Sequence, residues 1–302
     1  MAAGAELTTQ SAPKPPEERI ILAPEERRDT VLSVIRSARQ RLRLSVFRCT
    51  DYLVMDELAE AVHRKVQVEA LLTPRAKGTE QKRLKELGVV LEGMGAEVYR
   101  YSDPVVKYHA KYMVADEGPA LISSLNFTSK CFTNTCDFLL MTYDPEVVSG
   151  LRRLFESDCV SPEAPLPEGL SERLIVGPDR ARSQITALLQ QARRSIRIID
   201  HKIADPSIVS QLKSLKAAGI SVEVLGSGEV GGLLSHGKMI LVDESVAAIG
   251  SIALAPLNLD FRREVAIVVR DPRCVSQLNG FYRAVAATRA AAAVVNPGDQ
   301  AS

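Results

Sequence analysis

Two segments of the chain carry histidine and lysine at the same spacing. YHAKYMVADEGPALISSLN contains His109 and Lys111, and SHGKMILVDESVAAIGS contains His236 and Lys238. Residues i and i+2 of a strand share one face, so each histidine points the same way as its lysine. Imidazole groups transfer protons near neutral pH, and lysines are cations that can hold an anion. Either segment alone is also compatible with a solvated basic pair on an ordinary strand.

An aspartate occupies the same place in both segments, seven residues after the histidine. These aspartates are Asp116 and Asp243. An odd separation along an extended strand puts the carboxylate on the face opposite the histidine. We therefore expect Asp116 and Asp243 to have structural roles.

A second acidic residue follows each histidine at a distance of 28 positions. Asp137 follows His109 in this way, and Glu264 follows His236. Each acid begins a predicted strand, in NTCDFLLMTYD and RREVAIVVRD. Histidine, lysine, aspartate, serine and a downstream acid thus recur at matched spacing, which favours a catalytic site over a solvated surface pair.

The elements that must position these residues also occur twice. ARQRLRLSVF and ARRSIRIIDH begin 154 residues apart, at Ala38 and Ala192, and VQVEALL and ISVEVLG begin at the same offset. Helical and strand patterns alternate around both matches, which predicts an α/β fold with a mainly parallel sheet in each half. The histidines are only 127 residues apart, so the first half contains 27 extra residues, which we interpret as a helix plus a strand.

Composition suggests boundaries for these halves. The Pro-rich stretch CVSPEAPLPEGLSER separates them, and both ends of the chain have the composition of poorly ordered segments. We predict a disordered segment 1–18, a first half 19–160, a linker 161–172, a second half 173–289 and a flexible tail 290–302.

Charge and composition restrict the class of protein. The 302 residues are 46% hydrophobic and 25% charged, with a net charge of +1, which disfavours a non-specific nucleic-acid binder. Five scattered cysteines show no metal-ligand spacing and suggest reduced thiols, so we expect a cytoplasmic protein without metal or other cofactor. Neither a signal peptide nor a membrane span is evident, so we expect any membrane contact to be peripheral.

The duplicated motif resembles the signature of the phospholipase D superfamily, H-x-K-x4-D-x6-G-S-x-N. The resemblance covers residues 19 to 289 and implies two α/β halves related by a pseudo-two-fold axis, each a mainly parallel mixed sheet flanked by helices. One active site is then shared between the halves of a functional monomer.

The resemblance also implies roles for individual residues. It implies a two-step reaction through a covalent phosphohistidine, with His109 as nucleophile and His236 as general acid and then general base. Asp137 and Glu264 would accept hydrogen bonds from the far ring nitrogens. The implied phosphate-binding groups are Lys111, Lys238, Ser124, Asn126 and Ser251.

The chain departs from the family signature at two positions. Ser123 replaces the first motif glycine, and Ala253 stands where the second motif has asparagine. The phosphate clamp therefore has one motif amide instead of two, unless Asn258 supplies the second. Both His/Lys pairs are intact.

Several substrates fit a phosphohistidine site. We expect a phospholipid, cleaved to phosphatidic acid and an alcohol. The alternatives are a phosphatidyltransferase similar to cardiolipin synthases, and a metal-independent nuclease of the same superfamily. The near-neutral charge and few aromatic residues disfavour the nuclease. A scaffold that only binds phosphates is disfavoured by the complete His/Lys pairs.

Overall fold

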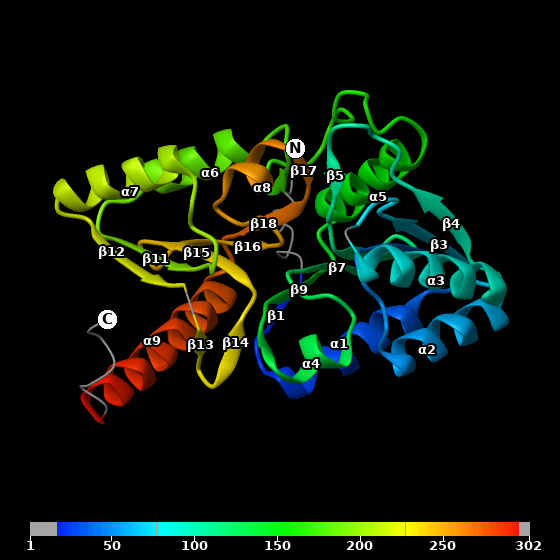
Figure 1. Cartoon of the computed structure of the whole chain (residues 1–302), viewed down its shortest axis with the longest axis horizontal. Coiled ribbons are helices and arrows are strands. Elements are labelled where there is room, and N and C mark those ends of the chain that lie inside the picture. Colours follow the sequence, from blue (N-terminus) through cyan, green and yellow to red (C-terminus); the bar gives the residue numbers. More distant parts are fainter. Residues whose placement is uncertain (1–16, 77, 227, 296–302) are drawn as a thin grey trace, which may run out of the picture.

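The computed structural model describes residues 17–76, 78–226 and 228–295, which form two halves, each built on a mixed sheet (Figure 1). Most of the two predicted flexible ends lies outside these residues. The last helix continues to Val295, so the first part of the predicted tail is helical backbone. Residues 161–173, which include the predicted linker, contain turns and loop between the two sheets.

The first half contains a seven-stranded sheet with helices on both faces. In spatial order its strands are β1 (Glu18–Ile21), β9 (Leu139–Thr142), β7 (Ala120–Ser123), β6 (Tyr112–Ala115), β2 (Arg41–Val46), β3 (Gln67–Leu72) and β4 (Glu97–Arg100). Its helices are α1 (Pro24–Ser37), α2 (Tyr52–His63), α3 (Thr79–Met94), α4 (Ser129–Thr133) and α5 (Pro145–Val160). In Figure 1, α1 and α2 lie below this sheet and α5 lies above it.

The second half repeats the arrangement with six strands. They are, in order, β10 (Leu174–Val176), β18 (Val265–Val269), β16 (Val246–Gly250), β15 (Lys238–Val242), β11 (Ser195–Ile199) and β12 (Ser221–Leu225). Its helices are α6 (Ala181–Gln190), α7 (Pro206–Ala217), α8 (Pro256–Asp260) and α9 (Pro272–Val295). Here α6 and α7 lie above the sheet and α9 below it, the reverse of the first half, as a two-fold relation requires (Figure 1).

The sheets are mixed, but the prediction that they are mainly parallel is wrong. Pairs β2/β3, β3/β4 and β11/β12 are parallel, whereas the other pairs of the two large sheets are antiparallel. For β6/β7 and β15/β16 the physical reason is the short turn after the motif strand. Asp116 and Asp243 adopt positive φ angles of 45° and 51° there, and so short a connection can join only antiparallel neighbours.

The 27 extra residues of the first half form the predicted helix and strand, α3 and β4. In their place the second half has a short hairpin of β13 (Glu229–Val230) and β14 (Leu233–Ser235). Strand β14 pairs with β8 (Thr135–Cys136) of the first half, and β17 (Arg262–Arg263) pairs with β5 (Lys107–Tyr108). Two small sheets therefore join the halves.

The halves also share a hydrophobic core. One cluster of buried side chains includes Val114 and Ile122 from the first sheet and Met239 and Ile249 from the second, together with residues of α5 and α9. Each half also has a cluster of its own, which lies between its sheet and its outer helices. The catalytic candidates thus sit between two sheets packed into one body.

Candidate active site

Both motif histidines face one cavity between the halves. His109 follows β5 and His236 follows β14, and both line a cavity of about 660 Å³. Lys238 also lines this cavity, whereas Lys111 is fully buried beside His109, with its Nζ 2.9 Å from the His109 carbonyl oxygen. The structure thus brings the two H-x-K motifs together.

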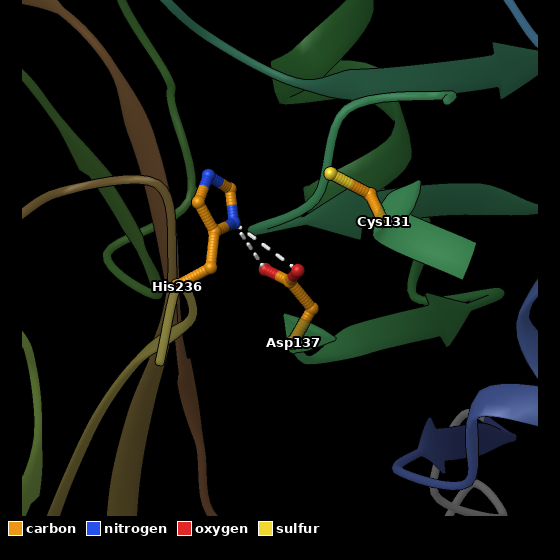
Figure 2. A group of neighbouring side chains, drawn as sticks. All are labelled: Cys131, Asp137 and His236. Atoms are coloured by element: carbon orange, nitrogen blue, oxygen red, sulfur yellow. Dashed lines mark hydrogen bonds and ion pairs between the residues drawn. The ribbon is translucent and has the colours of Figure 1, made fainter. Parts of the chain in front are cut away.

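Each histidine is paired with the acid of the opposite half. His109 Nδ1 lies 2.7 Å from Glu264 Oε1, and His236 Nδ1 lies 2.8 Å from Asp137 Oδ1 (Figure 2 shows the second pair). The two small inter-half sheets cause this exchange, because β5 runs beside β17 and β14 runs beside β8. The spacing of 28 residues identified these acids but not their partners.

The two carboxylates differ in the donors that surround them. Asp137 accepts hydrogen bonds from Ser124 Oγ at 2.6 Å and from Thr135 Oγ1 at 2.5 Å, besides His236. Burial opposes ionisation of Asp137, but the His236 ring and the two hydroxyls outweigh it, so the pKa of Asp137 is lowered. Asp137 is therefore held in its charged form.

Glu264 has fewer donors. Besides His109, Asn258 Nδ2 lies 3.1 Å from its Oε1, and the Arg262 guanidinium is 3.6 Å away. Burial raises the pKa of Glu264 to about 7, in spite of Lys111 and Arg262 nearby. The partner of His109 is thus less strongly ionised than the partner of His236.

His109 itself is held neutral. Burial lowers its pKa well below the usual range, and Lys111 and Arg262 lower it further. The Phe47 ring covers it, with the ring centroids 4.8 Å apart. When the Glu264 carboxylate accepts a hydrogen bond from Nδ1, the lone pair of the neutral ring is on Nε2, which lies 3.3 Å from Lys111 Nζ.

His201 occupies the corresponding place beside His236. It lines the cavity, and the two rings stack with centroids 6.3 Å apart. Burial, with Lys238 and Lys202 nearby, lowers the pKa of His201 to about 4. His201 is therefore a neutral cavity wall, as Phe47 is on the other side.

The predicted phosphate-binding residues occupy different environments. Ser251 lines the cavity, although its hydroxyl lies 3.3 Å from the Val265 carbonyl. Ser124 is buried and donates to Asp137, so its place is behind the site. Asn126 is also buried, and its Oδ1 has no hydrogen-bond partner among the described residues. Asn258 lines the cavity, and its side-chain amide donates a hydrogen bond to the Glu264 carboxylate.

The substituted motif position Ser123 is accommodated by a local turn. Its Oγ accepts a hydrogen bond from the Leu125 backbone N–H at 2.9 Å. Gly250, at the matching place, has a φ of 156°, and a Cβ there would lie 2.4 Å from the Val265 carbonyl oxygen. The second half thus requires glycine at a position where the first half accommodates serine.

The motif acids lie at the far end of their strands. Asp116 accepts from the backbone N–H groups of residues 39–41 at 2.7 to 2.9 Å, and Asp243 accepts from those of residues 193–195 at 2.7 to 2.8 Å. Each carboxylate thereby joins its hairpin to the start of the neighbouring strand, β2 or β11. Neither lines the active-site cavity.

Sequence reasoning missed four cavity cations. Arg75, Lys107, Lys202 and Arg262 all line the cavity. Lys107 precedes His109 by two residues and Arg262 precedes Glu264 by two, so strand periodicity could have placed both on the catalytic face. Arg75 and Lys202 follow strands β3 and β11 in loops, and no spacing rule indicates them.

One group of described side chains has metal-ligand atom types close together. Cys131, Asp137 and His236 offer atoms within 4.8 Å of one another (Figure 2). However, Ser124, Thr135 and His236 already occupy the two Asp137 oxygens. The donors fit an Asp–His hydrogen bond better than a metal centre.

Part of the chain matches a known family, and most of it is similar to a curated protein. Residues 31–159 match the family described as "Cardiolipin synthase, PLD-like domain". The polyphosphate kinase of Vibrio parahaemolyticus is 25% identical over 270 residues, which cover 77% of this chain and 38% of that protein. The chain thus spans about two fifths of the length of this relative.

Solved structures share the fold. The polyphosphate kinase of Porphyromonas gingivalis superposes with a TM-score of 0.70 at 20% identity, covering 87% of this chain and 46% of that one. The phosphatidylserine synthase of Haemophilus influenzae gives a TM-score of 0.70 at 11% identity, covering 87% and 85%. Within the described residues, every helix is too short or too polar to cross a membrane.

Proposed function

We propose that the chain is a member of the phospholipase D superfamily and cleaves a phosphodiester through a covalent phosphohistidine, with a phospholipid as its substrate; the match of residues 31–159 to a PLD-like domain and the shared fold support this. The observation that carries the proposal is the pair of crosswise His–carboxylate contacts facing one cavity. Two imidazoles in unlike environments can divide nucleophilic attack and proton transfer between them.

In the first proposed step, the lone pair of His109 Nε2 attacks phosphorus. The bond from phosphorus to the leaving oxygen breaks, and that oxygen takes the proton from His236 Nε2. Asp137 stabilises the protonated His236 ring, because it is an ionised carboxylate on Nδ1. The neutral state of His109 favours it as the nucleophile.

In the second proposed step, His236 removes a proton from water, and the water oxygen attacks phosphorus. The phosphorus–nitrogen bond breaks and its electron pair returns to His109. If an alcohol takes the place of water, the same step is a phosphatidyl transfer. Lys238 and Arg262 line the cavity where they can balance the charge of the phosphate oxygens.

A second candidate substrate is a polyphosphate chain. Arg75, Lys107, Lys202 and Arg262 add four cations to the cavity beyond the motif lysines, more than a single phosphodiester charge requires. A relative named polyphosphate kinase makes phosphoanhydride cleavage by the same two histidines a specific alternative.

Acid-quenched turnover tests the proposal. Phosphatidylcholine, phosphatidylglycerol, cardiolipin, polyphosphate and single-stranded DNA, each with a labelled phosphate, are offered separately with EDTA present. We expect label from one substrate to appear on His109 in the wild type and to be absent in His109→Ala. His236→Ala should lower turnover at least about 10³-fold.

Matched variants guard against misfolding. His63→Ala changes a histidine on α2 outside the cavity and should leave turnover unchanged. Label that never becomes attached to protein would exclude the covalent route. Label trapped on His236 alone would make His236 the nucleophile and His109 the proton donor.

A further inference from the structure

Three exposed apolar side chains lie on segments that also contribute residues to the active-site cavity. Leu257, which lines the cavity, is 41% exposed, Phe261 is 48% exposed and Val105 is 64% exposed. The Lys107 backbone N–H donates to the Phe261 carbonyl at 2.9 Å, so the segment that contains Val105 lies beside the end of α8. Figure 1 shows β5, β17 and α8 together where the halves meet. We call Val105, Leu257 and Phe261 the apolar rim.

Exposed cations accompany the apolar rim. Arg75, Lys107 and Lys202 are exposed and line the same cavity. Glu80 is the acidic residue among the described lining residues, and it is paired with Arg48 at 2.6 Å and Arg83 at 2.8 Å. The entrance therefore combines apolar side chains with uncompensated positive charge.

We infer that this entrance docks onto an anionic phospholipid bilayer, with the apolar rim at the level of the headgroups. This inference rests on the proposed phosphodiester chemistry and extends it by naming a bilayer as the form in which the substrate is met. A soluble phosphate chain would need the cations alone. Exposed Phe and Leu side chains beside the cations are explained by an apolar layer below the phosphates, because peripheral proteins combine these two contacts.

The geometry also places the bilayer next to the chemistry. Phe261 directly precedes Arg262, and Val105 lies two residues before Lys107, and both of these cations line the cavity. A lipid phosphate drawn from the bilayer would meet Lys107 and Arg262 before reaching His109. The docking surface and the catalytic surface are thus continuous.

Vesicle sedimentation tests the docking surface. The full chain is mixed with vesicles of phosphatidylcholine alone or with phosphatidylglycerol added. We expect binding to the anionic vesicles, about tenfold weaker for the double variant Val105→Ser/Phe261→Ser because less apolar area is buried. Lys202→Gln should weaken binding about fivefold through loss of one charge.

A control variant replaces two other exposed apolar side chains with serine, away from the cavity. Val89→Ser/Val160→Ser removes side chains that are 66% and 81% exposed on α3 and α5, and should bind as the wild type does. Equal binding by both double variants would overturn the docking surface. Binding that depends on charge alone, with no effect of the rim variant, would also overturn it and favour a polyanion.

Turnover of a soluble diester, bis(p-nitrophenyl) phosphate, separates this inference from the proposed function. The rim variant should keep wild-type turnover on the soluble diester while losing it on anionic vesicles. A wild type inactive on every phosphodiester would refute the proposed function, whereas loss of both activities by the rim variant would show a folding defect and contradict a purely interfacial role.

Discussion

The two catalytic candidates differ most in what surrounds their rings. His109 is close to Lys111 and Arg262, and burial raises the pKa of its partner Glu264 to about 7. His236 faces an aspartate fixed in its charged form by hydroxyl donors. The two histidines are therefore not equivalent. The difference favours His109 as the neutral nucleophile and His236 as the proton donor.

Arg262→Gln tests this electrostatic asymmetry. The Arg262 guanidinium lowers the pKa of His109, so its removal should raise that pKa. The nucleophile is active when neutral and is lost as pH falls through its pKa. The rate of His109 labelling therefore falls at low pH, and this acidic limb of the pH–rate profile should move to higher pH by up to about one unit. Quenched-flow labelling from pH 4 to 8 measures the shift.

The position of the limb separates this effect from weaker substrate binding. Lys107→Gln removes another cavity cation, one that is not among the largest causes of the lowered pKa of His109. It should reduce the labelling rate at every pH and leave the limb in place. An unmoved limb in Arg262→Gln would mean that Arg262 does not set the protonation of His109.

The sequence could identify residues at this scale but not their contacts. The repeat gave His109, His236, Asp137 and Glu264 as a set, because spacing survives duplication. It could not show that each histidine meets the acid of the other half, since that depends on β5 and β14 crossing between sheets. The burial of Ser124 behind Asp137 is equally a property of packing.

Among the elements, α1 holds the loop that carries Asp137. Arg27 of this helix is completely buried, and its guanidinium donates to the backbone carbonyls of Leu22, Cys131, Thr135 and Asp137 at 2.6 to 3.2 Å. The equivalent position of α6, 154 residues later, is Ala181. Among the described residues, the Glu264 side has no arginine at the matching position. We call the hydrogen bonds from Arg27 to this loop the Arg27 brace, and Arg27 is therefore a positioning residue for the proton donor.

Arg27→Met should remove the brace and leave several buried carbonyls unpaired. We expect the free energy of unfolding to fall by about 3 kcal/mol, measured by urea titration. Turnover of a substrate with a poor leaving group should fall more than turnover of a p-nitrophenyl ester, because the latter needs less help from His236. A purely structural role would lower both equally.

A charged residue on the surface of the same helix provides the control. Arg36 is 60% exposed and paired with Glu57, so Arg36→Met should change stability by less than about 1 kcal/mol. Equal stability of the Arg27 and Arg36 variants would refute the brace.

The elements were predictable where local rules decide them. Helix and strand alternation predicted the two α/β halves, and the 127-residue offset predicted α3 and β4. The antiparallel pairing of β6 with β7 and of β15 with β16 was not predicted. These strands are joined by short turns at Asp116 and Asp243, which leave too few residues for a parallel connection. Periodicity reports which residues are apolar and says little about strand direction.

At the scale of the whole molecule, a buried ion pair joins the halves next to the active site. Asp158 of α5 lies 3.1 Å from Arg263 of β17, and Arg263 also binds Asp179 at 2.7 Å. Both Asp158 and Arg263 are almost wholly buried. Because Arg263 immediately precedes Glu264, this pair fixes the approach of the second half to the first where His109 is held.

The pH dependence of stability should report this pair. Burial raises the pKa of Asp158 to about 7, although Arg263 opposes the rise. An unfolded aspartate has a pKa of about 3.9. Between these values the folded state binds the extra proton, so the contribution of Asp158 to stability falls as pH rises from about 4 to 7. Removing Arg263 should extend this loss above pH 7.

Arg263→Met is therefore expected to destabilise the chain by about 3–5 kcal/mol at pH 8, where Asp158 must either keep a buried charge without its partner or take up a proton that the unfolded aspartate does not bind. At pH 5 the loss should be smaller, because Asp158 can bind a proton. The double variant Asp158→Asn/Arg263→Met should recover much of the stability at pH 8, as urea titrations at both pH values would show.

Arg100→Met, which breaks the exposed Arg100–Glu92 pair, should cost less than about 1 kcal/mol at either pH. A loss in Arg263→Met that is equal at pH 5 and pH 8 would show that the contact between the halves depends on the shape of the Arg263 side chain and not on its charge.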